Sequence, residues 1–280
     1  MREIQADLII DKVARMCRDA NITIAPPLAD ALRKALDQEE SRAGKAVLKQ
    51  IIENAAIARE ECIPLCQDTG VAVFFVEWGE DVIITGSTLE EAINEGVRKG
   101  YGEGYLRKSM VDDPLRRSNT DDNTPAIIHA RPVAGERIKI TFLAKGGGSE
   151  NMSTVRMLKP SDGYEGVVDF VVNHIEEAGA NPCPPIIVGV GIGGTFEQAA
   201  YLSKLALLRP TGQPHPDPYY AEMEKEILRK INDLGIGPQG FGGRITALAV
   251  HILTYPCHIA SLPVAINIDC HAGRHMEIVI

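Results

Sequence analysis

The segment from Cys257 to His275 holds the densest group of side chains that can do chemistry, with two cysteines, three histidines and one arginine in nineteen residues. Alternating apolar residues from Leu262 to Ile268 predict a strand with one buried face, and Cys270 follows its end. Open α/β sheets bind ligands beyond their strand ends, so this position favours a site. A single free cysteine is more often a small buried hydrophobic residue, so the assignment needs support from other segments.

A second group of polar side chains, Cys66 to Asp68, lies between a proline and a glycine and precedes the apolar run from Val71 to Trp78. Proline and glycine favour irregular backbone, so we expect a loop at the entrance of a strand. Such a loop suits a metal ligand and an acid. A zinc site using Cys62 is conceivable, but a second cysteine pair at zinc-finger spacing is missing, and Cys62 fits better at the end of the preceding helix.

Three further segments, each rich in glycine, proline or polar residues, carry groups that could bind an anion or a metal. The long polar segment after Tyr105 carries Arg107, and either this residue or Arg117 is suited to bidentate binding of a carboxylate. Three glycines within Lys145–Asn151 let the backbone approach a ligand and direct N–H groups toward an anion, although a flexible hairpin fits the same residues. Cys183 lies between prolines, which give a ligating thiol a rigid mount.

The segment Gly189–Thr195 matches the G-x-G-x-x-G pattern of dinucleotide-binding folds, after a predicted strand and before a predicted helix. The acidic residue that should end the next parallel strand about 20 residues later is absent. We therefore expect either a helix N-terminus that binds a carboxylate or a tight packing turn.

The elements that must position these residues predict an α/β fold. Apolar residues at helical spacing predict a helical segment over about residues 1–62, followed by a mixed sheet with flanking helices. The predicted helices of the later part are 89–103, 163–178, one that runs to Leu208, and 217–234. We find no linker, repeat or low-complexity tract, so residues 1–280 are expected to form one compact domain.

Composition excludes several classes of protein. The formal net charge is −9 and the basic residues are scattered, which argues against a nucleic-acid or membrane surface. No apolar run approaches the roughly 20 residues of a membrane span, and the N-terminus lacks the pattern of a signal peptide, so a cytoplasmic location is expected. The six cysteines should then be reduced, and each is buried, reactive or bound to metal. Cys17 lies on an apolar helical stripe and is expected in the core.

Taken together, five ordered motifs resemble the class I (iron–sulfur) fumarate hydratase and L-tartrate dehydratase family, specifically its separate α subunit. The resemblance covers nearly the whole chain. The motifs are Cys-Gln-Asp-Thr-Gly at 66–70, Lys-Gly-Gly-Gly-Ser-Glu-Asn at 145–151, Asn-Pro-Cys-Pro-Pro at 181–185, Gly-Val-Gly-Ile-Gly-Gly-Thr at 189–195, and the C-terminal Ser-Leu-Pro-Val-Ala and Cys-His-Ala-Gly-Arg-His.

The resemblance implies a [4Fe–4S] cluster bound by three cysteines, with one iron left open to substrate. The matching ligands are Cys66, Cys183 and Cys270, whereas Cys17 and Cys62 match none. Asp68 is implied in acid–base catalysis. Substrate binding is implied for Gln67, Arg107, Gly147 and His258, and His271, Arg274 and His275 are candidates for supporting roles only.

The resemblance also implies a partner, because members of the family carry a second catalytic domain, fused or as a β subunit. A hetero-oligomer with a β subunit is therefore expected, acting on a dicarboxylate. We predict reversible hydration of fumarate to (S)-malate, with L-tartrate dehydration as the alternative. Two hypotheses of another class stay open, a dinucleotide-binding oxidoreductase and a metal scaffold without catalysis.

Overall fold

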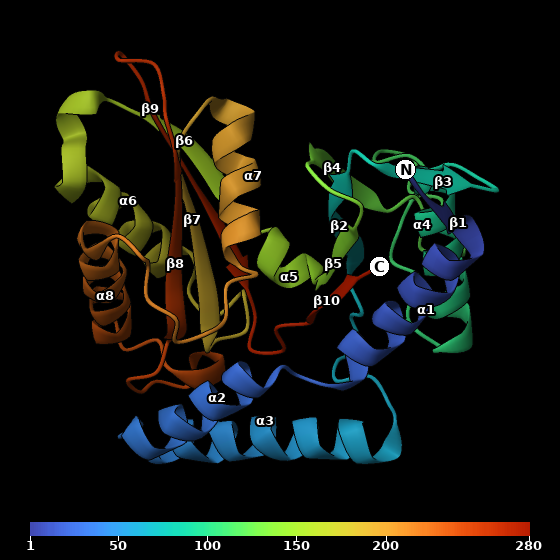
Figure 1. Cartoon of the computed structure of the whole chain (residues 1–280). Coiled ribbons are helices and arrows are strands. Elements are labelled where there is room, and N and C mark those ends of the chain that lie inside the picture. The colour runs from blue at the N-terminus through green and yellow to red at the C-terminus, as the bar shows by residue number, and fades with distance from the viewer. The chain divides into compact units, whose positions relative to one another are not determined.

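The computed structural model describes residues 1–280, and helices and strands are interspersed along the whole chain, which confirms the predicted α/β class (Figure 1). The chain divides into two units. Unit 1 comprises Met1–Ala25, Ala55–Gly147 and Arg274–Ile280, and unit 2 comprises Pro26–Asn54 and Gly148–Gly273. No helix combines the length and the apolar character that crossing a membrane requires.

Unit 1 is built on a four-stranded mixed sheet in the order β10-β5-β2-β4. Its strands are β2 (Val71–Gly79), β4 (Ile127–Val133), β5 (Ile138–Lys145) and β10 (His275–Val279). Helices α1 (Ala6–Ile22) and α4 (Leu89–Glu103) complete its core, in which the rings of Phe74 and Phe142 lie 5.2 Å apart. Gly96 and Gly100 of α4 let the two helices approach, since a Cβ at either position would lie under 3 Å from α1 atoms.

The N-terminus differs from the sequence prediction of helix from Met1. Residues Arg2–Gln5 form strand β1, which pairs in parallel with β3 (Val82–Thr85). Only Ile4 of β1 is buried. The pairing joins residues about 80 positions apart in sequence, so the local helical pattern carries no signal for it.

Unit 2 is built on the sheet β6-β9-β7-β8, formed by β6 (Thr154–Leu158), β7 (Ile186–Gly193), β8 (Ala247–Tyr255) and β9 (Leu262–Asp269). Strand β7 runs parallel to β8 and antiparallel to β9 and is buried along its whole length. In Figure 1, α7 (Phe196–Ala206) covers one face, and α6 (Gly163–Ala178) and α8 (Pro218–Asp233) cover the other. Unit 2 also contains α2 (Pro26–Gln38), and α3 (Arg42–Glu61) begins in it.

The glycines of β7 serve close packing of α7 on the sheet. A Cβ at Gly189 would lie 2.1 Å from the Ser203 carbonyl oxygen, and one at Gly191 would lie 2.1 Å from that of Ala199. Gly193 has φ +94° and its Cβ would lie 1.9 Å from the Tyr255 carbonyl oxygen. Of the alternatives left open for this motif, the structure therefore shows the packing turn.

The longer strands, expected in one mixed sheet, lie in two four-stranded sheets, and each sheet is covered by its own helices. Strands β6 and β10 escaped prediction because they are short and gain their stability from partners distant in sequence. That residues 1–280 act as one domain stays a prediction.

Candidate functional site

In unit 1, the loop Cys66–Gly70 connects α3 to β2 and places Asp68 between two backbone donors. Asp68 Oδ1 accepts the Gly70 N–H at 3.0 Å, and Oδ2 accepts the Gly147 N–H at 2.8 Å. Gly70 has φ +75° and a Cβ there would lie 2.8 Å from the backbone of Lys145, so only glycine fits. The carboxylate of Asp68 is thereby held in one orientation, as an acid–base group requires.

Two buried polar side chains, which the sequence pattern offers no reason to select, donate hydrogen bonds to the backbone of this loop. The Tyr101 hydroxyl donates to the Thr69 and Gly70 carbonyls at 2.8 and 3.2 Å, and Asn123 Nδ2 donates to the Gly70 carbonyl at 3.2 Å. Burial raises the pKa of Tyr101 above its ordinary value, so the hydroxyl stays protonated and donates. A tyrosine on a helical apolar stripe gives no sequence signal that its hydroxyl serves a distant loop.

Arg274 is a buried side chain that also donates to the backbone of this loop. It is 2% exposed, and its guanidinium donates to the Asp68 carbonyl and, at 3.2 Å, to Asn21 Oδ1. Both of these acceptors are neutral oxygen atoms, and the hydrogen bond to the Asp68 carbonyl places the guanidinium against the backbone of the loop. Arg274, a candidate for a supporting role, thus contacts the backbone of the loop that carries Asp68, and the role itself stays a prediction.

Arg107 and Gln67 are exposed and lie on backbone fixed near Asp68. Thr69 Oγ1 donates to the Arg107 carbonyl at 3.1 Å, which ties that segment to the loop. No ion pair or hydrogen bond engages the Arg107 guanidinium, so its planar donor face is available to an anion. Gln67 Oε1 lies 3.4 Å from Cys66 Sγ, which is half-buried.

Gly147 begins α5 (Gly147–Glu150), a four-residue helix, so the triple-glycine segment is helical here and not a hairpin. A Cβ at Gly147 would lie 3.7 Å from Asp68 Oδ2, an ordinary contact. Its N–H is the donor to Asp68. The glycine thus leaves open space beside the carboxylate.

In unit 2, the Cys183 turn (residues 180–184) holds an exposed thiol on strained backbone. Cys183 has φ +59°, in the left-handed region that non-glycine residues rarely adopt. Its N–H donates to the Ala180 carbonyl at 3.1 Å, and the Pro184 carbonyl accepts the Gln239 N–H at 2.8 Å. Such strain persists where surrounding contacts over-determine it, and it is typical of functional sites.

The Cys270 turn (residues 269–273) follows β9, as the sequence predicts. The Cys270 N–H donates to Asp269 Oδ1 at 3.1 Å, and the Gly273 N–H closes the turn on the Cys270 carbonyl at 3.2 Å. His271 Nδ1 lies 3.1 Å from the Cys183 carbonyl oxygen, so unit 2 brings the two cysteine turns together.

His258 lies elsewhere in unit 2, on the turn between β8 and β9. Its Nδ1 accepts the Ala260 N–H at 3.1 Å and its carbonyl accepts the Ser261 N–H at 2.9 Å, which leaves Nε2 facing outward as a donor. Cys257 Sγ lies 3.3 Å from the Ser261 carbonyl oxygen and is exposed.

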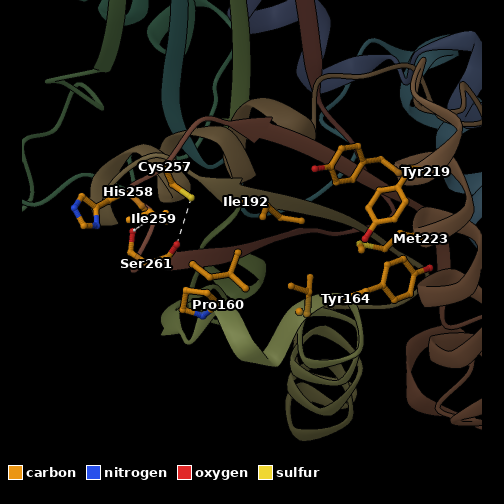
Figure 2. Close-up of a pocket in the computed structure, with 13 residues that line it drawn as sticks. Pro160, Tyr164, Ile192, Tyr219, Met223, Cys257, His258, Ile259 and Ser261 are labelled. Carbon is orange, nitrogen blue, oxygen red and sulfur yellow. Dashed lines mark hydrogen bonds between the residues drawn. The ribbon is translucent and has the colours of Figure 1, made fainter.

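This turn forms one end of a pocket of about 350 Å³. Figure 2 shows Cys257, His258 and Ser261 at that end and Tyr164, Tyr219 and Met223 at the other, with Ile192 between them. The imidazole of His258 points away from the tyrosines. The lining is mostly apolar, so the pocket by itself does not resemble a dicarboxylate site.

The predicted site residues therefore divide between the units. Unit 1 contains Cys66, Gln67, Asp68, Arg107 and Gly147, and unit 2 contains Cys183, His258 and Cys270. Within unit 1, Asp68 and Gly147 are in direct contact, and Thr69 links the loop to Arg107. Within unit 2, the two cysteine turns meet, whereas His258 belongs to the pocket.

The cysteines fall into two groups that bear on an iron–sulfur cluster. Cys17 is fully buried, and burial raises the pKa of its thiol well above the ordinary value, so it is unsuited to bind metal. Cys66, Cys183 and Cys270 are half-buried or exposed, lie on loops and are not in disulfides. Their thiols suit a three-thiolate cluster by donor chemistry. No preformed group of three or more metal-ligand side chains is present.

Comparison with known proteins adds independent information. The family model described as "Fumarate hydratase (Fumerase)" matches residues 10–279. A protein of Methanocaldococcus jannaschii, provisionally named an L(+)-tartrate dehydratase subunit alpha, is 47% identical over 272 residues, covering 95% of this chain and 95% of the relative. The L(+)-tartrate dehydratase subunits alpha of Escherichia coli strains UTI89 and K12 are 36% and 35% identical over 250 residues, covering 88% of this chain and 82% of each relative.

The match extends over both units and over all five motifs on which the resemblance was based. Similarity of this extent and identity confirms the predicted family. The chain belongs to the fumarate hydratase (Fumerase) family of hydro-lyases.

Proposed function

We propose that this chain is the α subunit of an iron–sulfur hydro-lyase that removes water from a four-carbon 2-hydroxydicarboxylate. The observation that carries the proposal is the similarity, over most of both chains, to relatives named as dehydratase α subunits. The loop-mounted thiols and the oriented carboxylate of Asp68 support it from the chain's own chemistry.

For the substrate, the names of the relatives favour L-tartrate, the alternative of the sequence analysis, over fumarate and (S)-malate. We therefore propose L-tartrate first. Fumarate hydration remains the second candidate because the family model carries that description. The two substrates differ by one hydroxyl, and a buried partner left without it costs about 1–3 kcal/mol, so one should be clearly preferred.

Cys66, Cys183 and Cys270 are proposed to bind a [4Fe–4S] cluster. When bound, the cluster supplies an open iron that acts as a Lewis acid and makes the substrate hydroxyl a better leaving group. This assignment predicts loss of the cluster when any of the three thiols is removed.

The chain's own side chains are proposed to orient substrate and move protons. In the dehydration direction, the carboxyl group of Asp68, oriented by two N–H donors, gives a proton to the hydroxyl as its C–O bond breaks, so that it leaves as water. The proton on the neighbouring carbon goes to a base that we propose the β subunit to supply. Arg107 binds a substrate carboxylate through its unengaged guanidinium. Gln67 and His258 Nε2 supply further donors to the substrate oxygens. Gly147, whose N–H already donates to Asp68, contributes by leaving space for the substrate beside that carboxylate.

A β subunit is proposed to complete the enzyme. The relatives bear the name subunit alpha, which implies such a partner for them. We propose a hetero-oligomer in the cytoplasm for this chain, with little turnover by the α chain alone.

The test is anaerobic reconstitution with iron and sulfide, alone and with the β subunit. We expect about four irons and four sulfides per chain, activity only with β, and kcat/KM at least tenfold higher for L-tartrate than for (S)-malate, equivalent to about 1.4 kcal/mol. A tenfold preference for (S)-malate would select the second candidate. Zinc binding without turnover would support a scaffold, and reduction of a nicotinamide cofactor would support the oxidoreductase.

A further inference from the structure

The glycine-rich connection from Gly235 to Gly243 is not used by the function proposed above, yet it is built in detail. Gly237 has φ +71° and a Cβ there would lie 2.3 Å from the Gly242 carbonyl carbon. Gly240 has φ +75° and its Cβ would lie 2.4 Å from the Ala180 Cβ. Between them, Gln239 has φ +52° without being glycine. A non-glycine residue in the left-handed region of φ/ψ space is strained, and such strain is typical of residues whose side chains make a specific contact.

Gln239 binds the Cys183 turn with both its backbone and its side chain. The Pro184 carbonyl accepts the Gln239 N–H at 2.8 Å and the Nε2 group at 2.7 Å. One carbonyl thus takes two donors from a single residue, which uses both of its lone pairs.

The same amide group reaches the Cys270 turn. Gln239 Nε2 lies 3.2 Å from His271 Nδ1, and that ring nitrogen lies 3.1 Å from the Cys183 carbonyl oxygen. If Nδ1 carries no proton, it accepts from Gln239, and if it carries one, it donates to Cys183. Gln239 therefore links the Cys183 turn to the Cys270 turn in the first tautomer, in which the ring proton is on Nε2.

We infer that Gln239 is a positioning residue that fixes the Cys183 turn relative to the Cys270 turn within unit 2. The inference rests on the proposed function, in which both cysteines bind one cluster. Groups that orient metal ligands without touching the metal commonly change metal affinity by about 10- to 100-fold when removed. Gln239 contacts the carbonyl that follows one thiol-bearing residue and the imidazole that follows the other.

The test compares Gln239→Gly with the wild-type full chain. Glycine adopts the positive φ without strain and keeps the backbone N–H bond to the Pro184 carbonyl. It removes the side-chain carboxamide, so only the side-chain hydrogen bonds are lost. In the metal-free chain we expect hydrogen exchange at Cys183 and from Cys270 to Gly273 to become about fivefold faster in both turns together. A purely local role would raise exchange in residues 236–243 alone.

A second measurement follows the cluster in the reconstituted chain. Gln239→Gly should lose iron to a chelator about 10- to 100-fold faster than wild type under anaerobic conditions. Gln213→Gly is the matched control, because Gln213 is exposed in another loop of unit 2 and its side chain makes no hydrogen bond. It should leave both measurements unchanged.

The two ideas fail in different ways. If Gln239→Gly exchanges and releases iron at the wild-type rates, the positioning role is wrong while the proposed function stands. If the wild-type chain binds no cluster, the proposed function fails, and the exchange experiment still decides whether Gln239 links the turns. A double variant with His271→Ala should be non-additive in exchange, because both residues act through one link.

Discussion

Two glycine-rich segments of this chain look alike as sequence and differ in the structure. In β7, glycine is required because the backbone of α7, or that of Tyr255, occupies the place of a Cβ. In Gly146–Gly148, the nearest atoms to a Cβ at Gly147 and at Gly148 lie 3.7 Å away. The first segment uses glycine for packing, and the second leaves space next to a carboxylate. A glycine in the sequence therefore cannot be assigned to close backbone packing until the element that lies next to it is known.

The largest effect should follow from filling the packed segment. Gly191→Ala places a Cβ 2.1 Å from the Ala199 carbonyl oxygen and 2.6 Å from the Ser203 nitrogen, so α7 must move. We expect the free energy of unfolding, measured by denaturant titration, to fall by about 3 kcal/mol or more. Gly102→Ala is the control, because a Cβ there meets nothing within 4 Å, and it should raise stability by up to about 1 kcal/mol. Equal effects of the two substitutions would refute the packing explanation.

The contrast between packed and exposed positions extends to the cysteines. Cys66→Ala, Cys183→Ala and Cys270→Ala should each abolish the broad visible absorbance of the cluster and leave the fold intact. Cys17→Ala should keep the absorbance and lower the free energy of unfolding by about 1–2 kcal/mol, because it empties a buried position. An intact spectrum in Cys270→Ala together with a bleached Cys17→Ala would reverse the assignment.

An intermediate loss of stability should follow from replacing Glu39, whose buried carboxylate packs against glycine backbone. Glu39 is buried and accepts the N–H groups of Glu40, Ser41, Arg244 and Ile245, and a Cβ at Gly243 would lie 2.5 Å from its Oε1. Glu39→Gln replaces one acceptor oxygen by a donor and should cost about 1–3 kcal/mol of stability at neutral pH.

The pH dependence of that cost follows from the pKa of Glu39. Burial raises it, but the four backbone donors outweigh burial and hold the pKa below its ordinary value. A carboxyl whose pKa is lowered on folding stabilises the protein above its unfolded pKa, and that contribution is lost as the pH falls through the folded one. The difference between wild type and Glu39→Gln, measured by denaturant titration, should therefore shrink below about pH 4. A difference that grows with acid would contradict this sign.

The smallest effect on stability should follow from filling the open segment. Gly147→Ala adds a Cβ at ordinary contact distance from Asp68 and should change the free energy of unfolding by no more than about 0.5 kcal/mol. If substrate lies in the space beside Gly147 and Asp68 as proposed, kcat/KM should still fall, by about tenfold. A large loss of stability would show that this segment is packed like β7.

How far the sequence predicts the site can be judged from particular residues. The loop position of Cys66, the strand end before Cys270 and the core position of Cys17 follow from local pattern, and the structure agrees. The distant side chains that hydrogen-bond to these loops and turns do not follow from local sequence pattern. Tyr101 and Asn123 act on Gly70, and Gln239 acts on Pro184, across 31, 53 and 55 positions of the chain.

The sequence by itself determined the α/β class, the longer helices, the family and the choice of candidate ligands, because periodicity, turn residues and ordered motifs are local properties. Only the tertiary structure decided which glycines are required, how the strands divide between two sheets, and which side chains contact the Asp68 loop and the cysteine turns. Those outcomes depend on which atoms meet after folding. A hydrogen bond or a steric contact between distant residues leaves no trace in either segment alone.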